Sequence, residues 1–396
     1  MVLYEQPQYL SQTGSRPRTG GLKVLTFSVN REDFLQGLSR VQNIVERKNT
    51  VPILSNVLID GTDDRLKMLA TDMEVGISGY VDASIKSQGS VTLSARKLFE
   101  IIKELPAEAV VTVQVKEDNL SEITCGSSSF ELKGLPAQDY PNLPTYEEGN
   151  FLTLNASNFR DMIKKTIYAA STDETRYNLT GILFEMEEKN GGGVLRLVAT
   201  DGHRLALVEK EAEGNIRPGE SVVIPRKSLN EVRKLLEEGE NETVEVDFQK
   251  QHGVFRKDSI VLTTRLIDMS FPNYHQVVPE DRTYMAEIDR EAMIHAIRRV
   301  SLLSSERSRA IKFNFGGGNV TIHINNPDLG TATEAVPIKY SGDDIEVTFN
   351  ARYMLDTLTS MDSELIEFGL KDELSPCVVS QKGEEDYLAV IMPMRI

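Results

Sequence analysis

The chain repeats itself three times, and this internal repeat limits its fold more than any other feature. A short alternating strand, an Asn or Asp suited to capping, and a helix with apolar residues at helical spacing recur at 25–41, 151–167 and 285–300. The period of roughly 130 residues is far longer than the roughly 20 to 50 residues of solenoid repeats. Each copy is therefore predicted to be a whole domain.

Two further signals recur in the same order. One is a strand that runs into a second helix, found at 91–105, 222–238 and 347–361. The other is the segment MLATDMEVGISG, which LVATDGHRLALV matches closely in the second copy and VTIHINNPDLGTA matches loosely in the third. This matched order indicates three tandem domains of one kind.

Short segments of alternating apolar and polar residues, such as VVTVQVKE, lie between these signals. Runs of such strands with two helices predict an α+β domain, in which the helices cover one face of an antiparallel sheet. We expect domains at 23–148, 149–283 and 284–396, arranged in line as a crescent. Residues 1–22 are rich in Gly, Ser, Thr, Gln and Pro without apolar periodicity, and are interpreted as a disordered leader or an expression remnant.

The composition is that of a folded protein. Apolar residues make up 40% of the chain and charged residues 26%, values typical of globular domains. No apolar run is long enough for a membrane span or a signal peptide, so a cytoplasmic location is expected. Cys125 and Cys377 lie far apart and without further metal-ligand pairs, so we expect two reduced, buried thiols and no metal site or cofactor.

Positive charge is concentrated on the predicted helices, although the net charge of −16 argues against a broadly basic, DNA-gripping surface. These helices hold 20 Lys and Arg against 13 Asp and Glu, so the remaining chain carries −23. If they line one concave wall, that wall suits a protein that surrounds DNA without reading its sequence. The alternative is that Lys and Arg merely favour solvated helix faces. The helices counted are 31–48, 95–105, 157–170, 225–238, 289–309 and 350–361.

An enzyme is the main rival class. Asp201 and His203 lie close together, and His is the usual general base, so a hydrolase using this pair is one alternative. No convincing nucleophile motif accompanies the pair, however. A phosphate-binding G-x-x-x-x-G-K-[ST] loop is also missing from the sequence, and the GGG runs at 191–193 and 316–318 are interpreted as hairpin turns. The sequence therefore favours a protein that is not an enzyme.

Several separated motifs resemble one known family. The three-fold order, the ATDGHRLAL segment, FPNYHQVVP and the terminal MPMRI are together similar to the β sliding clamp family, the processivity subunit of bacterial DNA polymerase III. The resemblance covers residues from about 23 to 396. It implies that two crescents join head to tail into a ring of six domains, with helices around duplex DNA and sheets outside. It also implies a separate ATP-driven loader, because the chain has no nucleotide-binding motif of its own.

The resemblance assigns residues to the dimer contact and to a peptide pocket, and a further group is predicted to contact DNA. Phe130 and Leu132 would meet Leu302 and Leu303 of the partner chain, with ordinary core residues as the alternative. Contacts to DNA are expected from Lys48, Arg96, Lys97, Arg160, Lys164, Arg176, Arg226 and Lys227, with Tyr177 stacking or packing near the strand. A pocket for short linear peptides would be lined by Leu179, Thr200, Gly202, His203, Arg204, Leu205, Pro272, Val277, Asn350, Tyr353, Val390, Ile391, Met392, Pro393, Met394, Arg395 and Ile396.

A pocket of aliphatic residues with a few polar groups suits peptides that carry Leu and Phe. The partners implied are the replicative polymerase, the clamp loader, repair polymerases and mismatch-repair proteins, beside a second copy of the chain and sequence-independent duplex DNA. Gln276 and Ile396 depart from residues common in the family, which are Arg and Leu, so partner preference is expected to shift. A scaffold that binds peptides without encircling DNA stays open as an alternative.

Overall fold

The computed structural model describes most of the chain after residue 23. The described residues are 24–45, 50–62, 64–147, 151–189, 192–214, 217, 219–237, 242–249, 251–279, 281–305 and 308–395. The leader predicted at 1–22 lies outside them.

In the described part of the first unit, two antiparallel sheets pack with the helices α1 (Arg31–Gln42) and α2 (Ala95–Glu104). One sheet has the strand order β5-β1-β7-β8-β9, formed by Ala83–Ser87, Thr26–Asn30, Val110–Val115, Leu120–Cys125 and Ser128–Lys133. The other has the order β6-β2-β3-β4, formed by Ser90–Ser94, Asn56–Asp60, Leu66–Thr71 and Val75–Val81.

The second unit has the same plan, with α3 (Ala156–Ile167) and α4 (Arg226–Glu237). One row of strands is β14-β11-β12-β13, formed by Ser221–Pro225, Gly181–Lys189, Gly192–Thr200 and Arg204–Gly214. The other row is β10-β15-β16-β17, formed by Leu152–Asn155, Thr243–Gln249, His252–Lys257 and Ile260–Arg265.

The third unit repeats the plan again, with α5 (Arg290–Val300) and α6 (Ala351–Ser360). Its first row is β22-β19-β20-β21, formed by Ile345–Asn350, Ala310–Gly316, Asn319–Asn326 and Gly330–Tyr340. Its second row is β18-β23-β24-β25, formed by Tyr284–Asp289, Leu365–Leu370, Cys377–Gln381 and Tyr387–Ile391. The predicted α+β class is confirmed, but each unit carries two sheets where the sequence suggested one.

The helices begin at side-chain caps that the repeat predicts. Asn30, Asn155 and Asp289 are each the last residue of a strand, and each side chain accepts a hydrogen bond from an amide in the first turn of the helix. Two helices, α1 and α5, end well before their predicted ends. α1 stops at Gln42. The apolar pattern that suggested a longer helix continues to Ile44, but this residue is buried from within a turn. α5 stops at Val300 and passes into the short 3-10 helix η6 (Ser301–Leu303).

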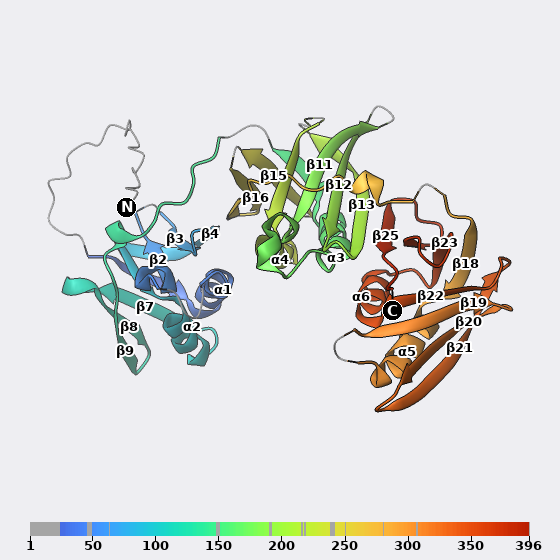
Figure 1. Cartoon of the computed structure of the whole chain (residues 1–396). Coiled ribbons are helices and arrows are strands. Elements are labelled where there is room, and N and C mark those ends of the chain that lie inside the picture. The colour runs from blue at the N-terminus through green and yellow to red at the C-terminus, as the bar shows by residue number, and fades with distance from the viewer. Residues whose placement is uncertain are drawn as a thin grey trace, which may run out of the picture.

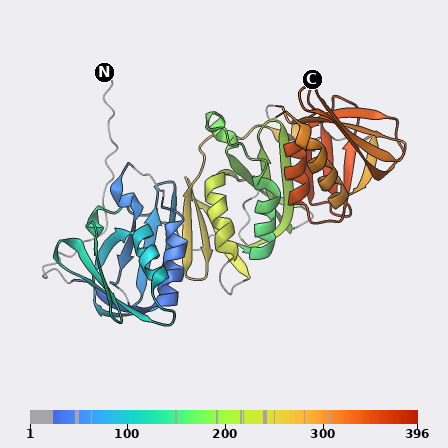
Figure 2. The same ribbon diagram turned by 90° about the horizontal axis from the view of Figure 1, so that it is seen from below.

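Strand pairing joins the units into one crescent. β4 pairs with β17 between the first and second units, and β13 pairs with β25 between the second and third. The helices α1 to α6 lie on the concave side, and the sheets form the convex side (Figure 1). Seen from below, the paired helices of the three units face the viewer (Figure 2). The predicted crescent with helices along one wall is therefore the observed arrangement.

Candidate functional site

A tight turn between β12 and β13 forms the centre of the predicted pocket. The Thr200 hydroxyl donates to the Arg204 carbonyl at 2.7 Å and accepts from the Gly202 amide at 3.0 Å. The Asp201 carboxylate accepts from the amides of His203 and Arg204 at 2.9 and 3.0 Å. Gly202 has a φ of +85°, which a residue with a Cβ adopts only with strain. These bonds fix the directions in which the His203 and Arg204 side chains leave the turn.

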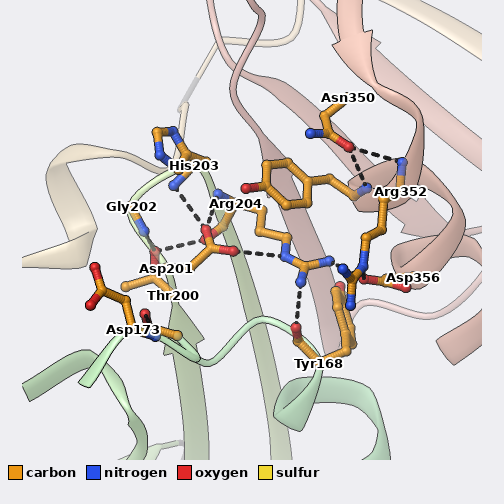
Figure 3. Close-up of polar contacts among 12 residues, drawn as sticks. Tyr168, Asp173, Thr200, Asp201, Gly202, His203, Arg204, Asn350, Arg352 and Asp356 are labelled. Carbon is orange, nitrogen blue, oxygen red and sulfur yellow. Dashed lines mark hydrogen bonds and ion pairs between the residues drawn. The ribbon is translucent and has the colours of Figure 1, made fainter. Parts of the chain in front are cut away.

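The Arg204 guanidinium joins the second unit to the third (Figure 3). It donates to Asp201 Oδ2 at 3.0 Å, to Asp356 Oδ2 on α6 at 2.7 Å, and to the Tyr168 carbonyl after α3 at 2.7 Å. It also lies over the Tyr353 ring, 4.5 Å from the centroid. Two carboxylates thus match the charge of a buried guanidinium. The polar end of Arg204, predicted to line the pocket, is used for the contact between units.

His203 and Tyr353 form one wall. Their rings stack with centroids 6.2 Å apart and an interplanar angle of 16°. Tyr353 stands in the first turn of α6, where Asn350 caps the helix and accepts from the Tyr353 amide at 3.3 Å (Figure 3). The His203 carbonyl accepts from the Met392 amide at 2.9 Å. The turn, the start of α6 and the chain tail therefore meet at this wall.

Apolar residues on the outer face of the shared sheet form a floor beside the turn. Leu205 pairs with Val390 across β13 and β25, and both are buried in one cluster with Tyr274. Leu179 is buried at the end of the 3-10 helix η4 (Glu174–Leu179). Val277 stays 38% exposed in the segment that connects the second and third units. An exposed apolar residue beside a buried apolar floor fits a surface that binds a partner.

The tail residues divide between two faces. Val390 belongs to the outer cluster, whereas Ile391 is buried in the main core, because successive residues of a strand point to opposite sides. Met392 to Met394 are half-buried and Arg395 is exposed, while Ile396 lies outside the described residues. Pro272 is exposed on the connecting segment. Ile391 therefore does not share the surface on which Val390 lies.

Most residues predicted to contact DNA are exposed or half-buried, and several are paired with neighbours. Arg96 and Lys97 both contact Glu100, each at 2.8 Å. The other contacts are Lys164 with Asp362 at 2.7 Å, Arg176 with the Asp201 carbonyl at 3.1 Å, and Lys227 with Asp72 at 2.6 Å. Arg160 and Tyr177 are exposed and Arg226 is half-buried, while Lys48 lies outside the described residues. The pairs are exposed enough to exchange a carboxylate for a phosphate, except where Asp72 is buried.

A cleft of about 420 Å³ opens between the second and third units. Arg176, Arg204, Arg226 and Arg352 line it together. Arg352 was not among the predicted DNA contacts, although its register in the third copy matches Arg226 in the second. That match in register was the sequence signal that could have identified Arg352.

The residues predicted to join two copies lie at opposite ends of the crescent. Among the described strands, β9 pairs only with β8, so the edge that carries Phe130 and Leu132 is open. Leu302 in η6 is 78% exposed, and Leu303 is partly buried beside it. β21 pairs with β18 only over its last residues, which leaves most of its outer edge unpaired in the described chain. An open edge is a template for a strand from another chain.

The Asp201–His203 pair is not arranged for hydrolysis. Both carboxylate oxygens of Asp201 accept hydrogen bonds from backbone amides or from Arg204, and the His203 ring stacks on Tyr353. Asp201 therefore orients the turn through the His203 amide, while the His203 imidazole lies against the Tyr353 ring. Across the part of the chain that the structure describes, no His, Cys, Asp and Glu side chains gather as a metal site. No described helix combines the length and apolar character needed to cross a bilayer.

Comparison with known proteins identifies the family. Family models of the DNA polymerase III beta subunit match in order along the chain: the N-terminal domain at 25–144, the central domain at 153–273 and the C-terminal domain at 275–395. The beta sliding clamp of Caulobacter vibrioides is 36% identical over 375 residues, covering 94% of this chain and 100% of the relative. The chain belongs to the DNA polymerase III beta subunit family.

Other members of the beta subunit family are similar to this chain over nearly its whole length. The beta sliding clamp of Pseudomonas aeruginosa is 36% identical over 93% of this chain and 100% of its own length. The crystal structure of the Caulobacter crescentus clamp superposes with a TM-score of 0.91 at 35% identity, covering 95% of this chain and 100% of that one. A Bartonella birtlesii clamp bound to griselimycin gives 0.89 at 34% identity, covering 94% and 100%.

The sequence missed the residues that hold this beta subunit site in place from a distance. Tyr168 and Asp356 fix Arg204, and Tyr274 fixes the connecting segment beneath Val277. Their partners are far away in the sequence, so neither periodicity nor a local motif points to them. Only the FPNY match to YPNL in the first copy marked the position of Tyr274.

Proposed function

We infer that this chain is a DNA sliding clamp: two copies close into a ring around duplex DNA and tether the replicative polymerase and other replication and repair proteins. The observation that carries the proposal is the crescent of three like units, with every described helix of the pairs α1 to α6 on its concave side. The boundaries 23–148, 149–283 and 284–396 are our proposed domains. We propose no catalytic step.

Ring closure is proposed to join unlike ends of two crescents. The β9 edge with Phe130 and Leu132 lies in the first unit, and Leu302 and Leu303 lie in the third. A contact between different surfaces closes into a ring only if the rotation between copies closes. Three units spread over a crescent support closure with two copies. Strand addition along β9 and burial of Leu302 would then supply the interface energy.

Retention on DNA is proposed to be topological. The candidate contacts are Arg96, Lys97, Arg160, Lys164, Arg176, Tyr177, Arg226 and Lys227, with Lys48 in addition, and we add Arg352 from the cleft. Phosphate contacts of this kind carry no base information, so they permit movement along the duplex. Affinity for short linear DNA should be weak and should fall with salt, because it depends on counterion release.

Partner docking is proposed to use the surface around the Thr200–Arg204 turn. Leu205 and Val390 form its apolar floor, His203 and Tyr353 one wall, and Val277 an exposed edge. A peptide that carries Leu and Phe could bury those side chains there, while polar groups of the turn fix its direction. Polymerase, loader and repair proteins are the proposed partners, through short linear segments of this kind.

The test compares retention on circular and linearised plasmid after loading by the matching ATP-driven loader, at a salt concentration that removes simple electrostatic binding. A sliding ring stays on circles and leaves linear DNA through the ends. The double variant Leu302→Asp and Leu303→Asp should sediment as a monomer and be lost from circles, whereas Leu374→Asp, at another exposed leucine, should behave as wild type. Equal loss of the wild-type chain from both DNAs would overturn the clamp proposal and favour a scaffold that never encircles DNA.

A further inference from the structure

Tyr274 lies at the middle of the segment that connects the second and third units. It begins the 3-10 helix η5 (Tyr274–Gln276), between the exposed residues Pro272 and Val277. Its ring is 4% exposed and packs in the cluster that contains Leu205 and Val390, the proposed pocket floor. One buried ring thus touches the floor, while its backbone leads to the exposed edge.

The Tyr274 hydroxyl reaches a charged group on the outer face of the sheet. It donates to Glu185 Oε2 at 2.5 Å and accepts from Arg196 Nη1 at 3.0 Å. Arg196 also contacts Glu187 at 2.8 Å and Glu209 at 2.5 Å, so its direction is fixed from several sides. Burial, with the nearby Glu185 carboxylate, raises the pKa of Tyr274, so the hydroxyl keeps its proton and remains a donor.

Few other bonds fix this part of the segment. The Ile267 amide donates to the Val223 carbonyl at 2.9 Å, before the exposed stretch begins. A longer bond of 3.4 Å joins the Asn178 side chain to the Ser270 carbonyl. The Val277 amide then donates to the Tyr274 carbonyl at 2.9 Å. The position of Val277 therefore depends on Tyr274. The position of Tyr274 depends largely on the packing of its ring and the bonds of its hydroxyl.

We propose that Tyr274 is a positioning residue of the partner pocket, which holds Val277 and Pro272 over the floor before a ligand arrives. This inference rests on the proposed function of the pocket and adds to it the anchor formed with Glu185 and Arg196. A wall that is already in place lowers the ordering cost of binding. Without the hydroxyl bonds the segment samples other positions, and each ligand must select the competent one. Affinity falls although no contacting side chain has changed.

The first unit supplies a matched control. Tyr140 opens the motif YPNL, in which Leu143 and not Tyr140 corresponds to Tyr274 of FPNY, so the control is matched by its buried hydroxyl and not by its register. It is 5% exposed, and its hydroxyl donates to the Asn56 carbonyl at 3.0 Å and accepts from the Thr71 amide at 3.2 Å. Both changes remove a buried tyrosine hydroxyl that donates one hydrogen bond and accepts another, with backbone partners at Tyr140 and charged side-chain partners at Tyr274. Only Tyr274 adjoins the pocket.

The experiment measures griselimycin binding to the full-length chain by titration calorimetry, since clamps related to this chain bind that compound. Tyr274→Phe should weaken griselimycin binding about tenfold, because it removes the hydroxyl that anchors the segment beside the pocket. Tyr140→Phe removes a hydroxyl away from the pocket, so it should change the affinity less than about twofold. The thermal midpoint of each variant is measured alongside its affinity, so that a loss of binding is separated from a loss of stability. Glu185→Gln combined with Tyr274→Phe should bind no more weakly than Tyr274→Phe alone, because the two changes break one anchor.

Deletion of Met392 to Ile396 tests the pocket separately. If the deletion abolishes binding while Tyr274→Phe matches wild type, the pocket stands and the positioning role is refuted. Equal weakening by Tyr140→Phe and Tyr274→Phe also refutes it, because the effect would then follow stability. Unchanged binding after the deletion overturns the pocket proposal itself, and the inference falls with it.

Discussion

The three units meet at two junctions that start from the same turn but use different side chains. The first junction, between the first and second units, pairs β4 with β17, and the second junction, between the second and third, pairs β13 with β25. In the first junction, the turn at 71–75 forms the same bonds as the turn at 200–204. The Thr71 hydroxyl donates to the Val75 carbonyl and accepts from the Met73 amide. The Asp72 carboxylate accepts from the amides of Glu74 and Val75. The repeated motif thus fixes the backbone at both places.

The fifth residue of the turn differs between the two junctions. Val75 in the first is an apolar core residue, whereas Arg204 in the second binds Asp201 and the Tyr168 carbonyl of its own unit and Asp356 across the junction. The second junction also holds the buried Lys165, which contacts Asp161 at 2.9 Å and Glu384 at 3.4 Å. At the first, the corresponding polar contact is the ion pair of the half-exposed Lys227 with Asp72. Polar bonding is therefore concentrated beside the proposed pocket.

The next residue suggests why the pocket is placed at the second junction. A Cβ added to Gly76 would lie 2.2 Å from Leu143 Cδ2, so Leu143 fills the space over the first turn. Leu205 occupies the position in the second turn that matches Gly76. It forms part of the pocket floor together with Tyr274, which corresponds to Leu143 in the repeat. One junction is closed by an aliphatic side chain, whereas the other keeps an apolar floor under the segment that Tyr274 anchors.

The largest expected effect is at Arg204. Arg204→Met should lower the free energy of opening the second junction by about 3 kcal/mol, because it leaves two carboxylates without their cation in a mostly buried place. Hydrogen exchange of the β13 and β25 amides measures this opening. Val75→Ala, at the matching position, should cost about 2 kcal/mol through a small cavity and should leave β13 and β25 unchanged. Wild-type exchange in Arg204→Met would mean that strand pairing alone holds the second junction.

How much of this contrast the sequence could reveal depends on sequence separation. The caps at Asn30, Asn155 and Asp289 and the three-fold order were predictable, because they depend on neighbours within a few residues. The Arg204 bond to Asp356 spans 152 positions, and no local pattern encodes such a pair. The pocket residues came from the resemblance to a family, which carries positions but not the direction of a side chain. Hence Ile391 was expected at a surface from which it turns away, and the ion pairs of Arg204 within the cleft were not foreseen.

A smaller effect concerns alkaline pH at the first junction. Burial raises the pKa of Tyr140 to about 12, against an opposing bond from the Thr71 amide. The unfolded chain releases this proton near pH 10, while the folded chain keeps it, so Tyr140 contributes stability below about pH 10 that is lost as pH rises toward 12. The slope in this window is about −1.4 kcal/mol per pH unit for one such group.

Tyr140→Phe should remove that share of the decline, measured as the denaturant midpoint between pH 9 and 12. Tyr168 and Tyr387, whose hydroxyls lie 3.0 Å apart at the second junction, also have pKa values raised by burial and should keep the rest of the decline in place. Parallel curves for wild type and Tyr140→Phe would show that the hydroxyl titrates in the folded chain as it does in water.

The smallest effect is expected at Lys227, the cation of the first junction. Its ammonium lies 2.6 Å from Asp72 Oδ2. The Asp72 side chain is buried, but the Lys227 side chain is half-exposed, and the other Asp72 oxygen already accepts from the amides of Glu74 and Val75. Lys227→Met should therefore cost the β4–β17 pairing only about 1 kcal/mol, and raised salt should reproduce most of that loss in the wild type. The same salt should leave β13–β25 protection nearly unchanged, because buried pairs are screened much less. If Lys227→Met opened the first junction as far as Arg204→Met opens the second, the two junctions would be equally dependent on charge, and the pocket would need another reason for its place.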